Sequence, residues 1–408
     1  MPGTSSGAII ATSLVTAKGT APWRGAELDA PVVIQEAGVA WADGVITFVG
    51  PADDLPDGDP QVFPGCTIAP GFVDCHTHLP FVGWRAEEFE LRLAGRSYRE
   101  LHGEGGIYRS AQLLAEASDE EVMAFCRPLV EEMADHGTTS VELKTGYGLS
   151  VEHELRQARL ARRLAQEAPQ AVTVTLLACH AVPVAMDRED WVRRACTELI
   201  PTAAAEGLCD AVDIYVEDIA FTLHDLRAVA DAAATLGLPV RCHADQLGPS
   251  GAAEEAVKLG AKSADHLNNV SNEGVRALGE GGTVGVLLPS STAFMRAVPP
   301  PVRTLMETGA AIALATDFNP GTSPVLSMPE AMATGCTLYG LTPLEALTAS
   351  TLNPAWVLGM AERSGTLEVG KRADLLVLEG EAFRQVPYRP GHNPVVHAYS
   401  GGTRIGGR

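Results

Sequence analysis

The chain has 408 residues, of which 46% are hydrophobic and 20% charged, and its formal net charge is −21. That length allows a large core and more than one domain, while the negative charge disfavours nucleic acid and anionic membranes as partners. No apolar run is long enough to cross a bilayer, no secretory signal is visible, and eight scattered cysteines without a CxxC pair favour reduced thiols, so we expect a cytoplasmic protein.

Short strands are predicted at both ends of the chain. The stretch APVVIQEAGVAWADGVITFVG (30–50) alternates and breaks at Asp43-Gly44, a dipeptide typical of a hairpin turn. Near the other end, GTLEVGKRADLLVLEG (365–380) contains two strand-like runs around a turn. Neither part shows a helical period, so we expect residues 1–68 and 361–408 to form one small β-domain that flanks a central unit.

The central unit, residues 69–360, alternates apolar runs of strand length with amphipathic helical patterns. This rhythm predicts parallel strands, and eight of them in that length suggest a (β/α)8 barrel. An open doubly wound sheet is the alternative, but it normally carries a glycine-rich nucleotide loop after its first strand, where this chain has VDCHTH. The runs are IAPGFVDCHTH, TTSVELKTGYG, AVTVTLLACHAVP, AVDIYVED, LPVRCHADQ, KSADHL, TVGVLLPS and AIALATDFNP, and the clearest helices are VEHELRQARLARRLAQEA, LHDLRAVADAAATLG and GAAEEAVKLG.

Polar side chains follow most of these strands, at the carboxyl ends where a barrel carries its chemistry. In GFVDCHTHLP, alternate side chains of a strand point the same way, so two imidazoles would leave one face together. Five of the eleven histidines fall at predicted strand ends, which a random scatter would rarely produce. The strand-end residues are His76, His78, Lys144, Tyr147, His180, Glu217, His243, Gln246, His266 and Asp317.

Four of these residues, His76, His78, His243 and Asp317, are expected to converge near the barrel axis as a metal site. Three imidazoles and one carboxylate suit Zn²⁺, and also Fe²⁺ or Mn²⁺. A catalytic site of this kind keeps a position open for water and lowers the pKa of that water. Asp317 could also accept the proton of the water as general base, and His266 could hold the hydroxide or stabilise the developing oxyanion. A buried core role is the alternative for His266.

One metal ion is the better interpretation. A two-metal site would need a bridging group on the fourth strand, usually a carbamylated lysine or a glutamate. The fourth run, VDIYVED, has no lysine, and Lys144 lies on another strand. Glu217 is the remaining candidate for a bridge.

Several motifs resemble the amidohydrolase superfamily: PGFVDCHTHL, ATDFNPG and the closing GTLEVGKRADLLVL. Narrower motifs, FVGWRAEEFELRLAGRSY, KTGYGLS, ACHAVP, RCHADQ, SADHL and DFNPGTSP, resemble the branch that opens the ring of 4-imidazolone-5-propanoate to N-formimino-L-glutamate in histidine degradation. The resemblance implies an α/β fold, with a metal-dependent (β/α)8 TIM barrel and a β-sandwich built from both chain ends. It also implies one zinc or iron ion and a small anionic heterocyclic substrate in the cytoplasm, and it suggests a homodimer.

Carried over residue by residue, the resemblance makes His76, His78, His243 and Asp317 the metal ligands. It assigns substrate contacts to Arg85, Tyr147, His180, Gln246 and Thr322, and pocket-lining positions to Tyr98, Asn319 and Gly321. The planar fork of Arg85 could hold a propanoate carboxylate bidentately. A surface ion pair with Glu87 or Glu88 is the alternative for Arg85.

Two departures from the family pattern affect these expectations. Some members have a glutamate where this chain has Gln246, and an amide cannot relay a proton, so proton transfer would fall to Asp317, His266 or water. Tyr108 and Arg109 in GEGGIYRSAQ are bulky for their segment, so the pocket wall there could differ.

Two other functions remain open at this point. The chain could be another cyclic amidase or an aminohydrolase acting on a related ring, although such deaminases usually carry a carboxylate at the position of Gln246. A non-catalytic metal-binding or scaffold protein is the third interpretation, against which a ligand set with an open position argues.

Overall fold

The computed structural model describes residues 6–97, 99–101 and 105–408. Its central unit is a sheet of eight parallel strands that follow one another in chain order. Each of the eight apolar runs identified in the sequence supplies one strand, so the predicted barrel is confirmed. The strands are β5 (Phe72–Asp74), β6 (Thr138–Lys144), β7 (Ala171–Cys179), β8 (Ala211–Val216), β9 (Val240–Ala244), β10 (Ser263–His266), β11 (Val284–Leu287) and β12 (Ile312–Leu314).

The barrel closes between its first and last strands through side-chain and loop contacts. The carboxylate of Asp74 accepts hydrogen bonds from the amide and the hydroxyl of Thr316, at 3.1 and 2.6 Å. Just beyond the strands, Thr77 and Phe318 form an isolated parallel bridge. The closure therefore lies directly beside His76, His78 and Asp317, and it fixes the first and the last strand ends relative to each other.

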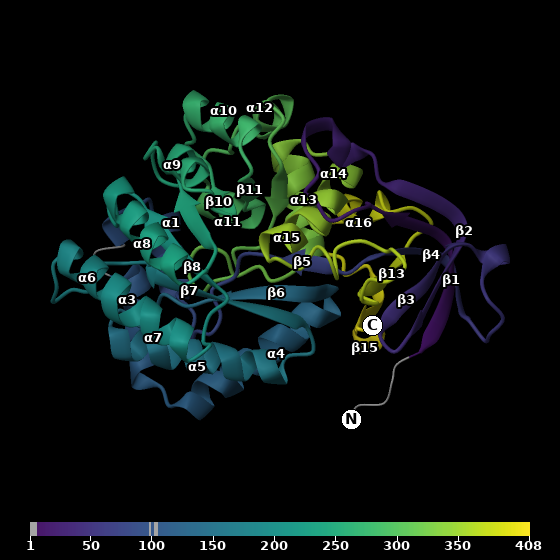
Figure 1. Cartoon of the computed structure of the whole chain (residues 1–408), viewed down its shortest axis with the longest axis horizontal. Coiled ribbons are helices and arrows are strands. Elements are labelled where there is room, and N and C mark those ends of the chain that lie inside the picture. Colours follow the sequence, from purple (N-terminus) through teal and green to yellow (C-terminus); the bar gives the residue numbers. More distant parts are fainter. Residues whose placement is uncertain (1–5, 98, 102–104) are drawn as a thin grey trace.

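Helices surround the barrel, as Figure 1 shows. The three helical patterns predicted from the sequence correspond to α5, α8 and α9, and Ser150 and Thr222 cap the first two with their hydroxyl groups. No helix in the described ranges is long and apolar enough to cross a membrane. The helices are α1 (Ala86–Leu93), α3 (Gly106–Glu116), α4 (Asp119–Asp135), α5 (Val151–Glu167), α6 (Arg188–Arg194), α7 (Ile200–Ala205), α8 (Leu223–Thr235), α9 (Ala252–Lys258), α10 (Asn272–Glu280), α11 (Pro289–Met295), α12 (Val302–Glu307), α13 (Met328–Tyr339), α14 (Pro343–Ala349), α15 (Leu352–Val357) and α16 (Gln385–Tyr388).

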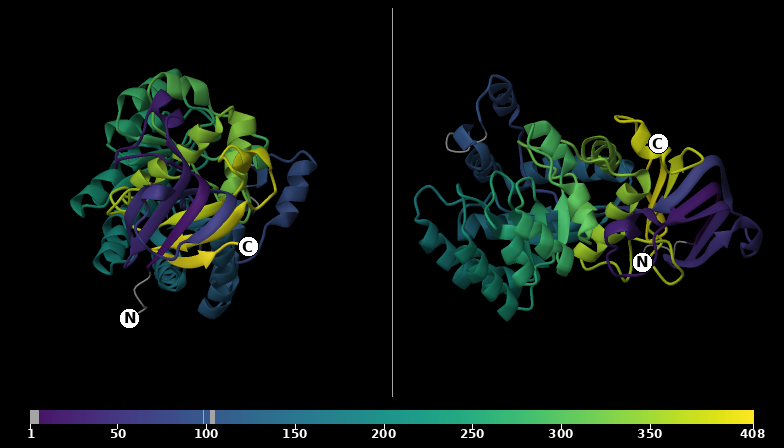
Figure 2. Two further views of the ribbon diagram at one scale, coloured as in Figure 1. Left: turned by 90° about the vertical axis from the view of Figure 1, so that its right-hand side faces the viewer. Right: turned by 90° about the horizontal axis from the view of Figure 1, so that it is seen from above.

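A second sheet, built from both chain ends, lies at one end of the molecule (Figure 2). Its seven strands run in the order β15-β14-β13-β4-β1-β2-β3, so strands from both ends of the chain join in one sheet, as predicted, where β13 pairs with β4. The exact domain limits, 1–68 and 361–408 against 69–360, stay a prediction. The strands are β1 (Gly7–Thr16), β2 (Val32–Ala42), β3 (Val45–Pro51), β4 (Gln61–Pro70), β13 (Leu375–Glu379), β14 (Val395–Ser400) and β15 (Thr403–Gly406).

Local sequence explains most of this second sheet. Asp43 and Gly44 have φ values of 53° and 77°, the positive angles that a tight hairpin turn between β2 and β3 requires. Alternate side chains bury a core that includes Ile9, Trp41 and Leu375. One expectation was wrong: of the two runs predicted in residues 365–380, only the second forms a strand, β13. The first, residues 366–369, is non-helical loop, and the hydroxyl of Thr16 satisfies the amide of Leu367.

Candidate metal centre and active site

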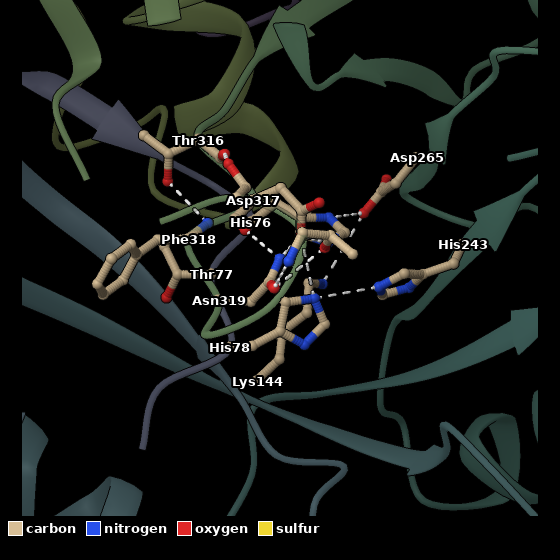
Figure 3. Close-up of polar contacts among 12 residues, drawn as sticks. His76, Thr77, His78, Lys144, His243, Asp265, Thr316, Asp317, Phe318 and Asn319 are labelled. Carbon is tan, nitrogen blue, oxygen red and sulfur yellow. Dashed lines mark hydrogen bonds and ion pairs between the residues drawn. The ribbon is translucent and has the colours of Figure 1, made fainter. Parts of the chain in front are cut away.

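The four predicted metal ligands meet at the carboxyl ends of β5, β9 and β12 (Figure 3). His78 Nε2 lies 3.3 Å from Asp317 Oδ1 and 3.5 Å from His243 Nε2. His76 Nε2 lies 3.6 Å from Asp317 Oδ1. All four residues are at most 3% exposed. The barrel therefore brings one ligand atom from each residue to a single buried point.

The outer nitrogens of two ligand histidines are already engaged. His76 Nδ1 lies 2.6 Å from Asp265 Oδ2, and His243 Nδ1 lies 3.2 Å from Asp213 Oδ1. If each Nδ1–H donates to its carboxylate, each Nε2 carries a lone pair that faces the centre. His76 Nε2 and Asp317 Oδ2 have no hydrogen-bond partner although both are buried. A bound cation would satisfy these atoms, so the donor set fits a divalent metal ion.

A buried lysine holds both carboxylates in place. Lys144 Nζ lies 2.7 Å from Asp213 Oδ2, 2.9 Å from Glu142 Oε2 and 3.8 Å from Asp265 Oδ2. Arg241, on β9, contacts the other oxygen of Glu142. All five groups are at most 1% exposed. This ionic cluster lies inside the barrel beneath the predicted ligands. Against burial, contacts with His243 and Lys144 lower the pKa of Asp213, whereas burial raises the pKa of Asp265 to about 6.

Burial and charge set the protonation of the centre. Burial lowers the pKa of His76 and of His78, and it lowers the pKa of His266 to about 3. These imidazoles are therefore neutral and can offer lone pairs. Burial alone would raise the pKa of Asp317, but its contacts with His78 and His266 hold that pKa below the ordinary value. Asp317 is thus an ionised carboxylate, as a metal ligand or a proton acceptor requires.

The loop after β12 holds Asp317 in an unusual backbone conformation. Its φ is 55°, in the left-handed region. The side-chain amide nitrogen of Asn319, Nδ2, donates to the backbone oxygen of Asp317 at 2.6 Å and to the Asp317 Oδ1 at 3.1 Å. The amide oxygen of Asn319 accepts from the backbone of Gly321 and from the backbone and hydroxyl of Thr322. Asn319 therefore organises this loop and orients the carboxylate of Asp317.

Arg85 is buried, only 5% exposed, and lines the cavity above the ligands. Its Nη1 donates to Ser110 Oγ at 3.2 Å, and its Nε lies 3.4 Å from Glu88 Oε2. A Cβ atom on Gly321 would lie 1.6 Å from Arg85 Nη2, so only glycine leaves room for the guanidinium there. The ion pair with Glu88 exists, but on a buried arginine that lines the cavity, and not as a surface pair.

The loop after β6 presents Tyr147 to the same cavity. Buried Glu154 and Gln157 of α5 accept hydrogen bonds from the backbone amides of residues 146–149. His180, after β7, stacks on His78 with ring centroids 5.2 Å apart, and its Nδ1 lies 3.0 Å from the carbonyl oxygen of Gly146. Donation by that Nδ1–H leaves His180 Nε2 as an acceptor in the neutral ring.

Most of the remaining predicted residues border the cavity too. Gln246, His266, Asn319 and Thr322 line it, together with Ile107 and Tyr215, which the sequence did not indicate. Tyr98 lies outside the described residues. Glu217 does not line this cavity; its carboxylate accepts from the amide of Leu247 at 2.7 Å, and burial raises its pKa to about 7. A bridging role for Glu217 is therefore not supported.

The bulky pair after the glycine-rich segment points away from the ligands. Tyr108 donates to the carbonyl oxygen of Val182 at 2.8 Å, and exposed Arg109 donates to Gln112. Their neighbours Ile107 and Ser110 face the site instead, one in the cavity wall and one on Arg85. The departure in this segment therefore does not narrow the cavity.

Sequence reasoning identified Lys144 as a strand-end residue but missed the ionic cluster around it. A signal was present, because each charge interrupts an apolar strand: VELK, VDIY, LPVRCH and SADH. Charged residues are almost never fully buried unless they are paired. Charges within four strands of one barrel, β6, β8, β9 and β10, therefore indicate that these residues pair with one another.

Solved structures with the same architecture include enzymes that differ widely in sequence. An adenosine deaminase from Xanthomonas campestris with bound zinc superposes with a TM-score of 0.73 at 20% identity, over 97% of this chain and 92% of that one. A guanine deaminase from C. acetobutylicum gives 0.73 at 16% identity, over 98% of this chain and 100% of that one. At these identities the likeness concerns the fold.

Sequence comparisons are more specific. Residues 67–401 match the model of the amidohydrolase family. A protein from Rhizorhabdus wittichii named imidazolonepropionase is 43% identical over 89% of this chain and 93% of its own length. Imidazolonepropionases of Rubrobacter xylanophilus and Agrobacterium fabrum are each 41% identical, over 92% and 97% of this chain and equal shares of their own lengths. The chain therefore belongs to the amidohydrolase family and, within it, to the imidazolonepropionases.

Proposed function

We propose that this protein hydrolyses 4-imidazolone-5-propanoate to N-formimino-L-glutamate. Water adds OH to the ring carbonyl carbon, the bond from that carbon to the ring nitrogen breaks, and the nitrogen takes a proton. The carbonyl carbon becomes a new carboxylate. The observation that carries the proposal is the convergence of His76, His78, His243 and Asp317 on a cavity that also contains buried Arg85, in a chain with imidazolonepropionase relatives.

One divalent ion, zinc or iron, would be held by His76, His78, His243 and Asp317. The unpartnered His76 Nε2 and Asp317 Oδ2 support this assignment, as does the orientation of two ligand rings by carboxylates. When bound, such an ion lowers the pKa of water toward neutrality and polarises a carbonyl group.

Proton transfer falls to Asp317 and His266. Asp317 is ionised and faces the cavity, so it can accept the proton of the attacking water and return it to the ring nitrogen that leaves. Neutral His266 also lines the cavity, where it can hydrogen-bond the attacking water or the oxygen that gains charge. Both side chains are fixed by the strand ends that carry them, so little reorganisation is needed.

Substrate orientation depends on the groups opposite the ligands. Arg85 is proposed to bind the propanoate carboxylate, with Tyr147, Asn319, Gly321 and Thr322 around it. In a chain of net charge −21, an anionic substrate needs a local cation of this kind. His180 Nε2, as an acceptor, suits a ring N–H of the substrate, because an imidazolone keeps one.

Gln246 is proposed to orient the ring by hydrogen bonds, since a carboxamide does not titrate. Gln246→Glu should then retain activity and add an ionisation to the pH–rate profile, while Gln246→Ala should mainly raise KM. A loss of kcat by many orders of magnitude in the alanine variant, with unchanged binding, would contradict this role.

The test of the reaction is the ultraviolet absorbance of the imidazolone ring, followed with ammonia and metal measured on the same sample. Loss of absorbance without ammonia supports the proposal. Ammonia release would instead indicate an aminohydrolase, and no change on a metal-loaded sample would indicate a protein that is not an enzyme for this ring.

A cytoplasmic location belongs to the same proposal. All eight cysteines are free thiols, and Cys75, Cys179 and Cys242, each next to a histidine, are fully buried among apolar side chains. Reduced thiols are typical of the cytoplasm. The homodimer that the family resemblance suggests stays a prediction.

A further inference from the structure

A second pocket, of about 530 Å³, opens beside the candidate active site and shares Gln246 with it. Among the residues that the structure describes, its lining contains no aspartate or glutamate, although the chain has 51 acidic and only 30 basic residues. Instead it contains four arginines: Arg92, Arg96, Arg99 and Arg296. This outer pocket is therefore a locally positive region of a strongly negative protein.

Among the described residues, two acids form ion pairs with these four arginines. Arg96 lies 3.9 Å from Glu100, and Arg99 lies 2.5 Å from Asp218. Both acids are more than half exposed, where ion pairs are weak. Arg92 is oriented differently, since it donates to the carbonyl oxygen of Gly321 at 2.9 Å. Within the described part of the chain, the four arginines of the pocket thus outnumber the acids paired with them, which favours an anionic ligand.

Two aromatic side chains of the outer pocket stack on each other. Phe89 and Phe294 stack with centroids 4.8 Å apart and an interplanar angle of 21°. The guanidinium carbon of Arg92 lies 5.0 Å from the Phe294 centroid. Planar rings and guanidinium groups together favour a small ligand that carries both a flat ring and a carboxylate.

Helix α1 connects the two pockets. Arg85 precedes its first residue and lines the inner cavity, while Phe89 and Arg92 follow four and seven positions later and line the outer pocket. Residues at this spacing share one face of a helix. A carboxylate that moves along this face passes from the outer arginines to Arg85.

We propose that the outer pocket is a second binding site, for small carboxylates that carry a flat ring, and that the substrate occupies it before it reaches Arg85. The ligand class follows from the arginines and the phenylalanines of the pocket. That the physiological ligand is the substrate rests on the proposed function.

Binding of imidazole-4-propanoate, a ring carboxylate with no carbonyl to hydrolyse, tests the site by calorimetry. In Arg85→Met the inner carboxylate contact is removed, and residual binding should remain. Adding Arg96→Gln and Arg296→Gln should weaken that residual binding at least about tenfold, because charge-assisted hydrogen bonds are lost. The matched control adds Arg127→Gln and Arg163→Gln, two arginines of α4 and α5 about one-third exposed, and should change it less than about twofold.

Residual binding that both pairs of substitutions weaken equally would overturn the outer site, as would no residual binding at all. If Arg85→Met does not fold, the wild-type chain replaces it: two binding events are expected there, and one in the Arg96→Gln, Arg296→Gln variant. Two unchanged events in that variant would contradict the proposal.

Kinetics separate this inference from the proposed function. With Arg85 intact, Arg96→Gln and Arg296→Gln should lower kcat/KM about three- to tenfold at low ionic strength, leave kcat unchanged, and lose their effect in about 0.5 M salt. If the wild-type chain does not hydrolyse imidazolone propanoate, the proposed function fails while the binding experiment still reports on the pocket. Normal hydrolysis with unaltered kcat/KM and probe binding would refute the outer site alone.

Discussion

The two sheets of this molecule bury very different material. The seven-stranded sheet built from both chain ends, the chain-end sheet, has an apolar core formed by residues such as Ile9, Leu14 and Val377. The inside of the barrel holds ionised groups instead, with Lys144 and Arg241 among carboxylates. The chain-end sheet is thus stabilised by the alternating burial of apolar side chains. In the barrel interior, buried charges lower the stability, but they orient the predicted metal ligands.

Backbone conformation differs in the same way. Four non-glycine residues with positive φ lie at barrel strand ends: Asp245, His266, Leu267 and Asp317. In the chain-end sheet, two non-glycine residues have a positive φ: Asp43, in a hairpin turn that needs it, and Glu36, within β2. Unfavoured backbone angles persist only where the surroundings impose them, and they gather at functional sites. The comparison shows that such angles are concentrated at the strand ends of the barrel, beside the candidate site.

The largest expected effect comes from removing a ligand. His243→Ala should abolish tight metal binding and lower kcat/KM at least about a thousandfold, because the reaction loses its activated water. Metal content by mass spectrometry and the absorbance assay measure this. The control is His397→Ala in the chain-end sheet, where the ring contacts Phe63 and Tyr399 and should affect neither property. Two ions per chain, or full retention in His243→Ala, would contradict a single site.

A buried lysine should matter for function only in the barrel. Lys144→Met removes a cation that contacts three buried carboxylates and leaves only Glu142 with another, Arg241, so we expect the unfolding free energy to fall by about 3–5 kcal/mol and metal affinity about 10- to 100-fold. Lys371→Met is the matched change near the chain-end sheet, where the ammonium donates to the carbonyl oxygens of Gly19 and Ala361. It should lower stability without changing metal affinity. Equal metal affinities in the two variants would remove the distinction between the regions.

A methyl group added at Gly321 tests the position of the Arg85 side chain. Gly321→Ala would displace the guanidinium, and loss of a charge-assisted hydrogen bond should raise KM about 10- to 100-fold. Gly7→Ala in the chain-end sheet creates a comparable clash, with a Cβ 2.5 Å from Trp41, and should lower the melting temperature only. Steady-state kinetics and thermal unfolding of both variants decide it: an unchanged KM in Gly321→Ala would mean that the carboxylate binds elsewhere.

The smallest expected effect concerns pH. Burial raises the pKa of Glu154 from the ordinary glutamate value of 4.5 to about 7, so the folded chain binds an extra proton between these pH values. Its contribution to stability is complete below pH 4.5 and is lost as the pH rises through 7, at no more than about 1.4 kcal/mol per pH unit. The free energy of unfolding, measured with urea at several pH values in this window, should fall less steeply with rising pH in Glu154→Gln than in the wild type. The same slope in both would assign the pH dependence to other groups.

The position of residues at strand ends predicted which side chains converge but not what supports them. The convergence of His76, His78, His243 and Asp317 could be predicted because parallel barrel strands carry their chemistry at one rim. Asp213 and Asp265 were missed because they lie within apolar runs, where the strand pattern drew attention to the hydrophobic residues. Their function depends on Lys144, which lies 69 residues before Asp213 in the sequence. Only the closed barrel brings these groups together.

Contacts made by loops were the hardest to foresee. Arg85 was predicted as a carboxylate anchor, but not that Gly321 must lack a side chain to admit it. In the chain-end sheet, the Asp43-Gly44 turn followed from local rules, while residues 366–369 alternate like a strand and have no strand partner. Local pattern thus determines elements, and tertiary pairing decides which of them form.

The position of β4 has a consequence for the way the chain is made. One edge of β4 pairs with β1, which is synthesised before it, and the other pairs with β13, about 300 residues later. During translation that second edge waits, unpaired, while the whole barrel is being synthesised. An unpaired strand edge is a template for association with other chains. A ribosome that stalls before residue 375 would therefore yield a chain whose barrel sequence is complete but whose β4 lacks its partner β13. That free edge of the chain-end sheet could then pair with another chain.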